Sequence, residues 1–294
     1  SLSIMVAYLI MVATVRFMYP AVKGALARFM MYAGPFAGAM YITFSDTHWG
    51  DSNETEVYAL SAFVMGLCTW LALEWYRNPA GRAVPGEERL ERSHARGLVY
   101  LIVYLLALGI GFHLGTVLVY GGIFLLFLLV KEKAFGNTEL IIYSFGFAVL
   151  LADMTLYHSS GATIAGLAIF AVLVAWSTVK KGRFALVATG LLALGISVHL
   201  YMYIRSHFDP AIDMVNPQTW KAMYAHLRRE QYPPMNILER KAPIFFQLSY
   251  FWGYFMDQFR MLGDVRLGIL NIGAASTAIP VALGLFGIAA NWRR

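Results

Sequence analysis

Long apolar stretches separated by short polar segments dominate the sequence. We interpret nine of them as membrane-crossing helices, because about 20 apolar residues cover the roughly 30 Å hydrocarbon layer of a bilayer. They are residues 2–19, 28–44, 57–75, 98–112, 115–130, 139–156, 161–179, 184–204 and 267–290. A tenth stretch, 243–259, is apolar and aromatic, and we interpret it as an interfacial helix. The pattern predicts an all-α, polytopic transmembrane helical bundle of about nine spans with amphipathic helices on its outer face.

The basic residues alternate between the short segments and so orient the spans. Thirteen lysines and arginines occupy the first, third, fifth and seventh segments, and none lies in 45–56, 113–114 or 157–160. Cytoplasmic segments are enriched in Lys and Arg, so we expect the odd segments to be cytoplasmic. If 243–259 also crossed, the terminal Arg293 and Arg294 would lie outside, against this rule. The net charge of +6 thus indicates membrane topology rather than nucleic-acid binding.

Composition excludes several classes. The chain is 59% hydrophobic and 14% charged, whereas soluble domains average about 45–50% and about 25%. A single cysteine, Cys68, excludes a disulfide framework and a cysteine-based metal site.

Three parts follow from this topology. We expect a bundle of eight spans over 1–204, an outer loop with interfacial amphipathic helices over 205–266, and a final span with a cytoplasmic end over 267–294. Within the loop, Asn216-Pro217 predicts a helix start with Asn216 as N-cap. Residue 1 falls on the outer side and inside an apolar run, so we expect a fragment whose earlier spans are absent.

Candidate chemistry collects at the expected outer face. The second segment carries four carboxylates and no cation, namely Asp46, Asp51, Glu54 and Glu56. It is either a solvated acidic loop or a general-base or metal-assisted site. Asp153 is ionisable yet lies inside an expected span, where a charge is costly. We expect it to face a cavity or a partner, with Tyr157 one turn away, unless it is simply hydrated near the surface.

A nine-residue pattern occurs twice, at 106–114 and 192–200. Each copy contains glycine, which permits close helix packing, and each has a histidine at the outer boundary, His113 or His199. These histidines are either ordinary interface residues or contacts to a phosphate or polar headgroup.

Two groups of motifs resemble a known family. The first is Phe44-Ser45-Asp46-Thr47 with Trp49, followed by Glu56-Val57-Tyr58-Ala59-Leu60-Ser61. The second is Ile204-Arg205-Ser206, Asp209-Pro210-Ala211-Ile212-Asp213 and Arg229-Glu230-Gln231-Tyr232. Together they resemble a bacterial membrane family of unknown function whose animal relatives are protein O-mannosyltransferases, and whose architecture is similar to the GT-C glycosyltransferases.

The resemblance implies an outward-facing site and inverting transfer from a polyprenyl-phosphate sugar, without a nucleotide cofactor. Asp46 and Glu56 are then the catalytic candidates, in one outer cavity with the substrate-binding candidates Arg205, His199, Tyr203, Glu54, His113 and Asp153. Arg205 is the candidate for the lipid phosphate, because a guanidinium fork matches its oxygens. The family's acidic motif lies in a first outer loop that would precede this sequence, so we expect that acid to be missing and the fragment to bind donor without transferring sugar. His48 stands where the family has phenylalanine.

Three functions remain open from the sequence. The first is a glycosyltransferase-like protein that uses a polyprenyl-phosphate-linked, mannose-type sugar to glycosylate a protein or glycan acceptor. The second is a secondary transporter or lipid flippase, and the third is a non-catalytic membrane scaffold. For the first we expect an integral protein of the bacterial inner membrane with a periplasmic active face. No metal ligands are predicted, and a divalent metal is left open.

Overall fold

The computed structural model describes residues 2–53, 57–77, 88–129, 137–153, 160–228, 230–232, 242–258, 266–267 and 270–291. Within these ranges the chain is helical, apart from turns and the antiparallel pair β1 (Arg266–Leu267) and β2 (Leu270–Asn271). The expected all-helical class is therefore confirmed in the described part. The chain forms two compact units, one of residues 1–73 with 240–294 and one of residues 74–239.

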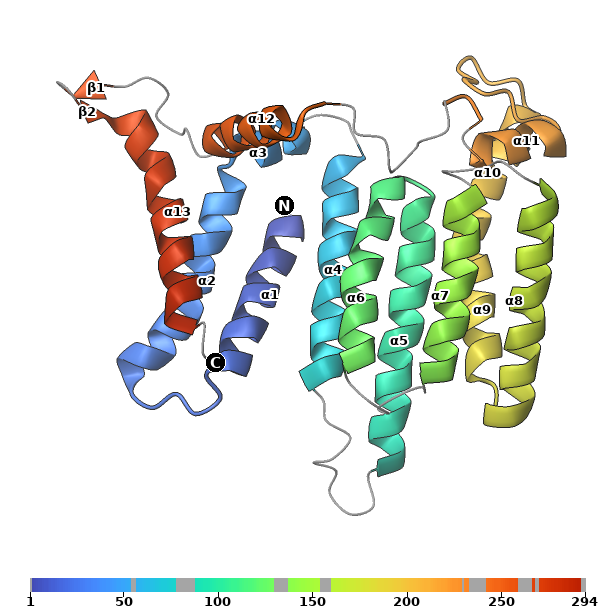
Figure 1. The fold of residues 1–294 in the computed structure, drawn as a ribbon, viewed down its shortest axis with the longest axis horizontal. Coiled ribbons are helices and arrows are strands. Elements are labelled where there is room, and N and C mark those ends of the chain that lie inside the picture. The colour runs from blue at the N-terminus through green and yellow to red at the C-terminus, as the bar shows by residue number, and fades with distance from the viewer. Residues whose placement is uncertain are drawn as a thin grey trace. The chain divides into compact units, whose positions relative to one another are not determined.

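The first unit contains upright helices and two that lie across them (Figure 1). Its helices are α1 (Leu2–Met18), α2 (Ala25–Thr43), α3 (Asp46–Asn53), most of α4 (Tyr58–Arg77), α12 (Ile244–Asp257) and α13 (Ile272–Asn291). The Tyr19 hydroxyl donates to Asn291 Oδ1 at 2.7 Å and joins the ends of α1 and α13. Helices α3 and α12 cross the opposite end of this unit, and the interfacial location of α12 stays a prediction.

The second unit is a helical bundle with a short helix across one end (Figure 1). Its elements are α5 (Glu88–Ile110), η1 (Leu114–Val117), α6 (Leu118–Leu129), α7 (Asn137–Ala152), α8 (Ser160–Lys181), α9 (Phe184–Ile196), η3 (Ser197–His199), α10 (Leu200–Ser206) and α11 (Trp220–Leu227). The repeated pattern forms its closest contact. A Cβ on Gly195 of α9 would lie 2.6 Å from Ala107 Cβ and 2.8 Å from Leu108 N of α5. The two copies pack against each other through glycine, as predicted.

Three helices are long and apolar enough to cross a membrane: Tyr58–Arg77, Gly161–Lys181 and Phe184–Ser206. The other expected spans coincide with helices, but these are shorter or less apolar; α6, for example, has 12 residues and α7 has 16. At 1.5 Å per residue, 16 residues extend only about 24 Å. The structure thus supports three candidate spans among the described residues rather than nine.

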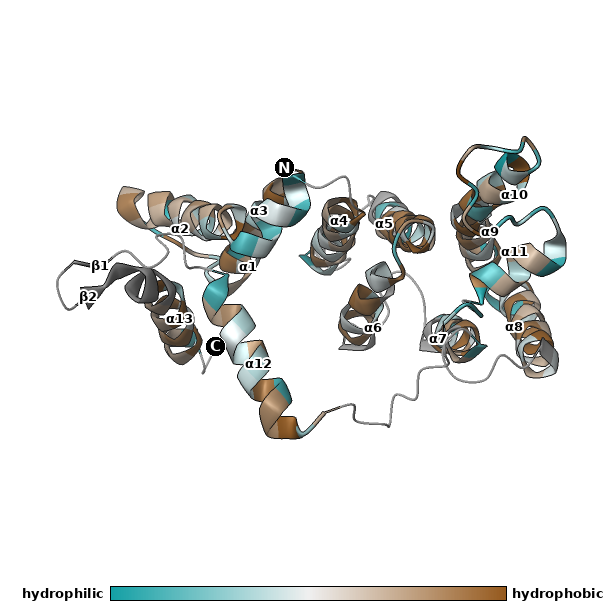
Figure 2. Cartoon of the chain, turned by 90° about the horizontal axis from the view of Figure 1, so that it is seen from above, coloured by the Kyte–Doolittle hydropathy of each residue, from teal (hydrophilic) through white to brown (hydrophobic). Residues whose placement is uncertain are grey.

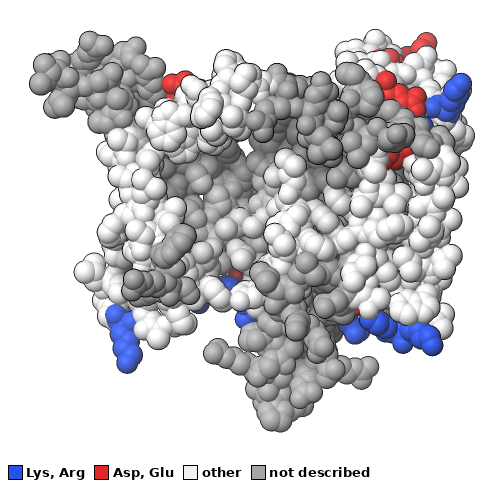
Figure 3. All heavy atoms as spheres, viewed as in Figure 1, with Lys and Arg blue, Asp and Glu red and all other residues white. Residues whose placement is uncertain are grey.

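Polar and charged groups lie at the ends of the bundles. Seen from above, hydrophilic residues collect on α3 and α11, whereas α8 and α9 are mostly hydrophobic (Figure 2). Within the second unit, Lys and Arg gather at the end where α8 meets α9, where Lys180, Lys181 and Arg183 are exposed (Figure 3). The acidic side chains visible on this face lie mainly at the α11 end.

Candidate functional site

A buried cluster of charged side chains joins three elements of the second unit. Thr163 of α8 donates from Oγ1 to Asp153 Oδ1 at 2.5 Å, just beyond the end of α7. Arg228, which follows α11, places Nε 3.2 Å from Asp153 Oδ2, and the two side chains are 7% and 6% exposed. The prediction that Asp153 faces a partner is confirmed. Tyr157, the partner that we expected, lies outside the described residues.

Arg228 makes two further contacts. Its Nη1 lies 3.1 Å from Glu230 Oε1, a carboxylate whose side chain is 44% exposed. Its guanidinium also lies 5.1 Å from the centre of the Tyr224 ring, a cation–π distance. Removing two charges from water is costly unless both are well paired. These contacts offset part of that cost, although Nε and Nη2 of Arg228 are buried and make no hydrogen bond to another described residue. Arg228 therefore holds α11 to the ends of α7 and α8.

Sequence reasoning missed Arg228 as a site residue. The structure buries it, with 5% of the residue exposed. Asp153 was the signal that could have identified Arg228. A carboxylate inside an apolar span requires a cation or a hydrogen-bond donor, and the expected outer loop, which is rich in arginine, could supply one.

Aromatic and histidine side chains surround the same end of the bundle. The rings of Tyr203 and Trp220 stack with centroids 4.4 Å apart and an angle of 14°. Tyr203 also contacts His207, with ring centroids 4.7 Å apart. His199 Nδ1 lies 2.9 Å from the carbonyl oxygen of Ile196. Burial lowers the pKa of His226 below its ordinary value, and nearby His199 lowers it further.

Arg205 and the start of α11 complete this region. Arg205 lies in the last turn of α10 and is exposed. The predicted N-cap, Asn216, is wrong: it has φ of 44°, whereas an N-cap is extended. Thr219 takes that role, because its hydroxyl accepts from the Ala222 backbone N–H at 3.1 Å.

His113 has a local structural role. Its Nδ1 accepts a hydrogen bond from the Gly115 backbone N–H at 3.0 Å, and this contact caps η1. His199 ends η3. The matched histidines thus both lie at junctions between helical segments but in different roles, since His113 precedes η1 in an extended conformation and His199 ends η3 in a helical one. A ligand contact by either one stays a prediction.

The described part of the acidic segment, Asp46–Asn53, is a helix rather than the expected loop. Asp46 begins α3, where a carboxylate is favoured by the helix dipole. Its backbone N–H donates to the Gln258 carbonyl at 3.0 Å, and Thr47 Oγ1 lies 2.8 Å from the Tyr254 hydroxyl. The Asp46 side chain is exposed. Burial lowers the pKa of His48, an effect that Asp51 partly offsets.

The predicted common cavity remains a prediction. Glu54 and Glu56 lie outside the described residues. Asp46 belongs to the first unit, and Arg205, His199 and Tyr203 belong to the second. Among the described residues, no group of three or more His, Cys, Asp or Glu side chains is arranged to hold a metal ion.

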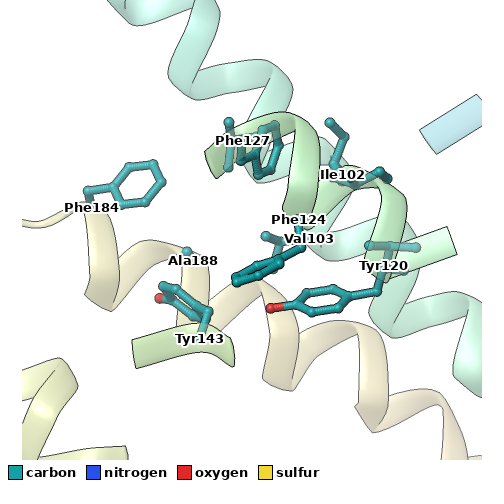
Figure 4. Close-up of a pocket in the computed structure, with 11 residues that line it drawn as sticks. Ile102, Val103, Tyr120, Phe124, Phe127, Tyr143, Phe184 and Ala188 are labelled. Carbon is teal, nitrogen blue, oxygen red and sulfur yellow. The ribbon is translucent and has the colours of Figure 1, made fainter. Parts of the chain in front are cut away.

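An apolar cavity of about 50 Å³ lies inside the second unit between α5, α6, α7 and α9. Figure 4 shows aromatic rings of Tyr120, Phe124 and Tyr143 around it. The Tyr143 hydroxyl donates to the Ala185 carbonyl at 2.5 Å. Because its polar groups are bonded within the protein, this cavity offers no reactive group.

A family model matches the first part of the chain. Residues 1–135 match the model of the family described as the protein O-mannosyl-transferase TMEM260 N-terminal domain. No curated protein and no solved structure matches the chain. The match spans α1 to α6 and ends before the Asp153–Arg228 cluster. Through these residues the chain is similar to the N-terminal domain of the protein O-mannosyl-transferase TMEM260.

Proposed function

We propose that this chain is a GT-C-type, glycosyltransferase-like membrane protein with about nine spans. It takes a mannose-type sugar from a polyprenyl phosphate and delivers it to a protein or glycan acceptor at the outer face of the bacterial inner membrane. The relation of residues 1–135 to the TMEM260 N-terminal domain carries this proposal. Two groups of polar residues, one in each unit, support it, and each contains an exposed charged side chain, Asp46 in the first unit and Arg205 in the second.

The group in the first unit, which contains Asp46, supplies the general base for sugar transfer. In an inverting transfer, an acceptor hydroxyl oxygen bonds to the anomeric carbon and the bond from that carbon to the phosphate oxygen breaks. A carboxylate takes the hydroxyl proton, and the lipid phosphate leaves with the electron pair. Asp46 is exposed at the start of α3, which α12 fixes through Gln258. We assign the base to Asp46 or Glu56, with Glu54 beside the acceptor.

The second group binds the donor. Arg205 follows 21 helical residues of the candidate span Phe184–Ser206, a length of about 32 Å that reaches the headgroup level. Its exposed guanidinium is the cation for the lipid phosphate. His199 and Tyr203 lie on the same helical segment and contact the sugar phosphate, with His113 and Asp153 as further polar contacts.

Donor binding tests the proposal first. The chain in lipid nanodiscs is titrated with a polyprenyl-phosphate mannose, and Arg205→Ala is compared with Arg183→Ala, an exposed arginine at the opposite end of the bundle. Loss of a charge-assisted contact of about 1.5–3 kcal/mol weakens binding roughly 10- to 100-fold. Arg183→Ala leaves it unchanged. Absence of saturable binding by the parent chain contradicts the proposal.

Sugar transfer to a peptide or glycan acceptor tests the base, and transfer by the parent chain would overturn the expectation that the chain binds donor without transferring sugar. Asp46→Asn lowers transfer by about 10²–10⁴ if Asp46 is the general base. Asp51→Asn, the same change on the same helix, leaves the rate within a few fold. Movement of the intact lipid across the bilayer without sugar loss would favour a flippase instead.

A further inference from the structure

The loop between α10 and α11 folds around a network of polar contacts that starts at the buried Ser206. The Ser206 hydroxyl, at a residue that is 1% exposed, donates to Asp213 Oδ2 at 2.5 Å. The other oxygen, Asp213 Oδ1, accepts from the Asn216 backbone N–H at 3.1 Å. Gln218 Nε2 donates to the Ser206 carbonyl at 3.1 Å. These bonds close residues 206–218 around a polar centre.

The same loop turns large apolar side chains outward. Phe208 is 72% exposed, Ile212 82% and Met214 93%. Two non-glycine residues adopt left-handed backbone conformations, Asp209 with φ of 47° and Asn216 with φ of 44°. Such conformations are uncommon and persist where surrounding contacts specify them. The arrangement is therefore built into the loop, and it leaves three large apolar side chains side by side with exposed polar residues such as Asp209.

The position of the loop identifies what covers these side chains. The candidate span Phe184–Ser206 has 23 residues and extends about 34 Å, so its end lies at the edge of the hydrocarbon layer. Tyr201 and Ile204, on the last two turns of that span, are 66% and 56% exposed. The apolar surface continues from these residues to Phe208, just past the end of α10.

We propose that residues 207–216 form a membrane-inserted loop that places Phe208, Ile212 and Met214 in the lipid interface around α10. The surface below the loop is the lipid-facing side of a candidate span, and the loop extends it without a break. Seen from above, the loop lies at the α10 edge of the second unit rather than over its centre (Figure 2). The partner is the bilayer itself, so this contact does not depend on glycosyl transfer.

Fluorescence quenching in lipid nanodiscs tests the proposal. An environment-sensitive fluorophore is attached to Met214→Cys in a Cys68→Ser background, with Gln231→Cys as the matched exposed, uncharged position in the same unit. We expect brominated lipids to quench the label at 214 and aqueous iodide to quench the label at 231. Iodide quenching at 214 equal to that at 231 would overturn the proposal. Protection of 214 from both quenchers would also overturn it, because a protein surface would then cover the loop.

A second variant tests whether the polar centre sets the insertion. Asp213→Ala removes both acceptors, so the label at 214 should become accessible to iodide. A label at Ile204→Cys, within the span, should stay quenched by brominated lipid and shows that the bundle is intact. Unchanged lipid quenching at 214 in Asp213→Ala would refute the polar centre as the cause.

Discussion

Replacing Asp153 by alanine is expected to release α11 from the ends of α7 and α8. Asp153 accepts from Thr163 at 2.5 Å and pairs with Arg228 at 3.2 Å. Alanine removes both contacts and leaves the Arg228 guanidinium, 7% exposed, with less compensation for its burial. The consequence is local, because α11 is a short helix that packs at the end of the bundle.

The magnitude follows from burial and from the contact that remains. Breaking a buried ion pair by removing one partner typically costs about 3–5 kcal/mol. Arg228 keeps its ion pair with Glu230 at 3.1 Å, but the Glu230 side chain is 44% exposed, so it compensates only partly for the loss of the Asp153 carboxylate. We therefore expect the lower end, about 3 kcal/mol, which is roughly a hundredfold increase in the opening equilibrium of α11.

Native-state thiol labelling measures this opening. Met223 of α11 is 2% exposed, so Met223→Cys in a Cys68→Ser background reacts with a water-soluble maleimide only after α11 opens. When closing is faster than labelling, the rate is proportional to the opening equilibrium. Asp153→Ala should raise it about a hundredfold. Thr163→Val, which removes a single hydrogen bond of about 1 kcal/mol, should raise it about fivefold.

Two results would refute this reasoning. One is a labelling rate in Asp153→Ala within about threefold of the parent, a difference below 1 kcal/mol that a buried pair should exceed. The other concerns the double variant Asp153→Ala/Arg228→Met, which removes both charges. It should open less readily than Asp153→Ala, and an equal or faster rate would show that the unpaired charge is not the cause.

Three further predictions follow from other features. Gly195→Ala should lower the unfolding temperature of the chain, because its Cβ would lie 2.6 Å from a side chain of α5 and overpacking costs about 1–3 kcal/mol. Gly190→Ala is the control and should leave the unfolding temperature unchanged, because the space around Gly190 is open. Cysteines at Gly50 and at Lys180 should react with an impermeant thiol reagent from opposite sides of the membrane, and labelling from one side would contradict the topology. Burial lowers the pKa of His226 in the folded chain, so the unfolded chain binds this proton more readily and the stability of the fold should fall as the pH drops below about 6.5. His226→Gln should make the unfolding temperature less dependent on pH over this range. The same pH dependence in His226→Gln as in the parent would refute the prediction.

The helical class and the positions of the apolar helices were predictable from the sequence, whereas α3 lies in a segment that was expected to be a loop. Apolar runs at helical length mark each segment, and local hydrogen bonding satisfies the backbone of a helix without distant partners. The glycines of the repeated pattern likewise predicted close packing, because only a residue without a side chain lets two backbones approach this closely. The need of Asp153 for a partner was also predictable, since an isolated charge in an apolar span is costly.

The tertiary structure decided which residues meet. Asp153 and Arg228 are 75 positions apart in the sequence, and no local periodicity relates them; only the packing of α11 on α7 and α8 brings them together. The N-cap of α11 moved from Asn216 to Thr219 because the polar centre of the loop holds Asn216 in a left-handed conformation. The same polar centre explains why the side chains of Ile212 and Met214 face outward. Composition fixes how much apolar surface a chain carries, and long-range contacts determine where it faces.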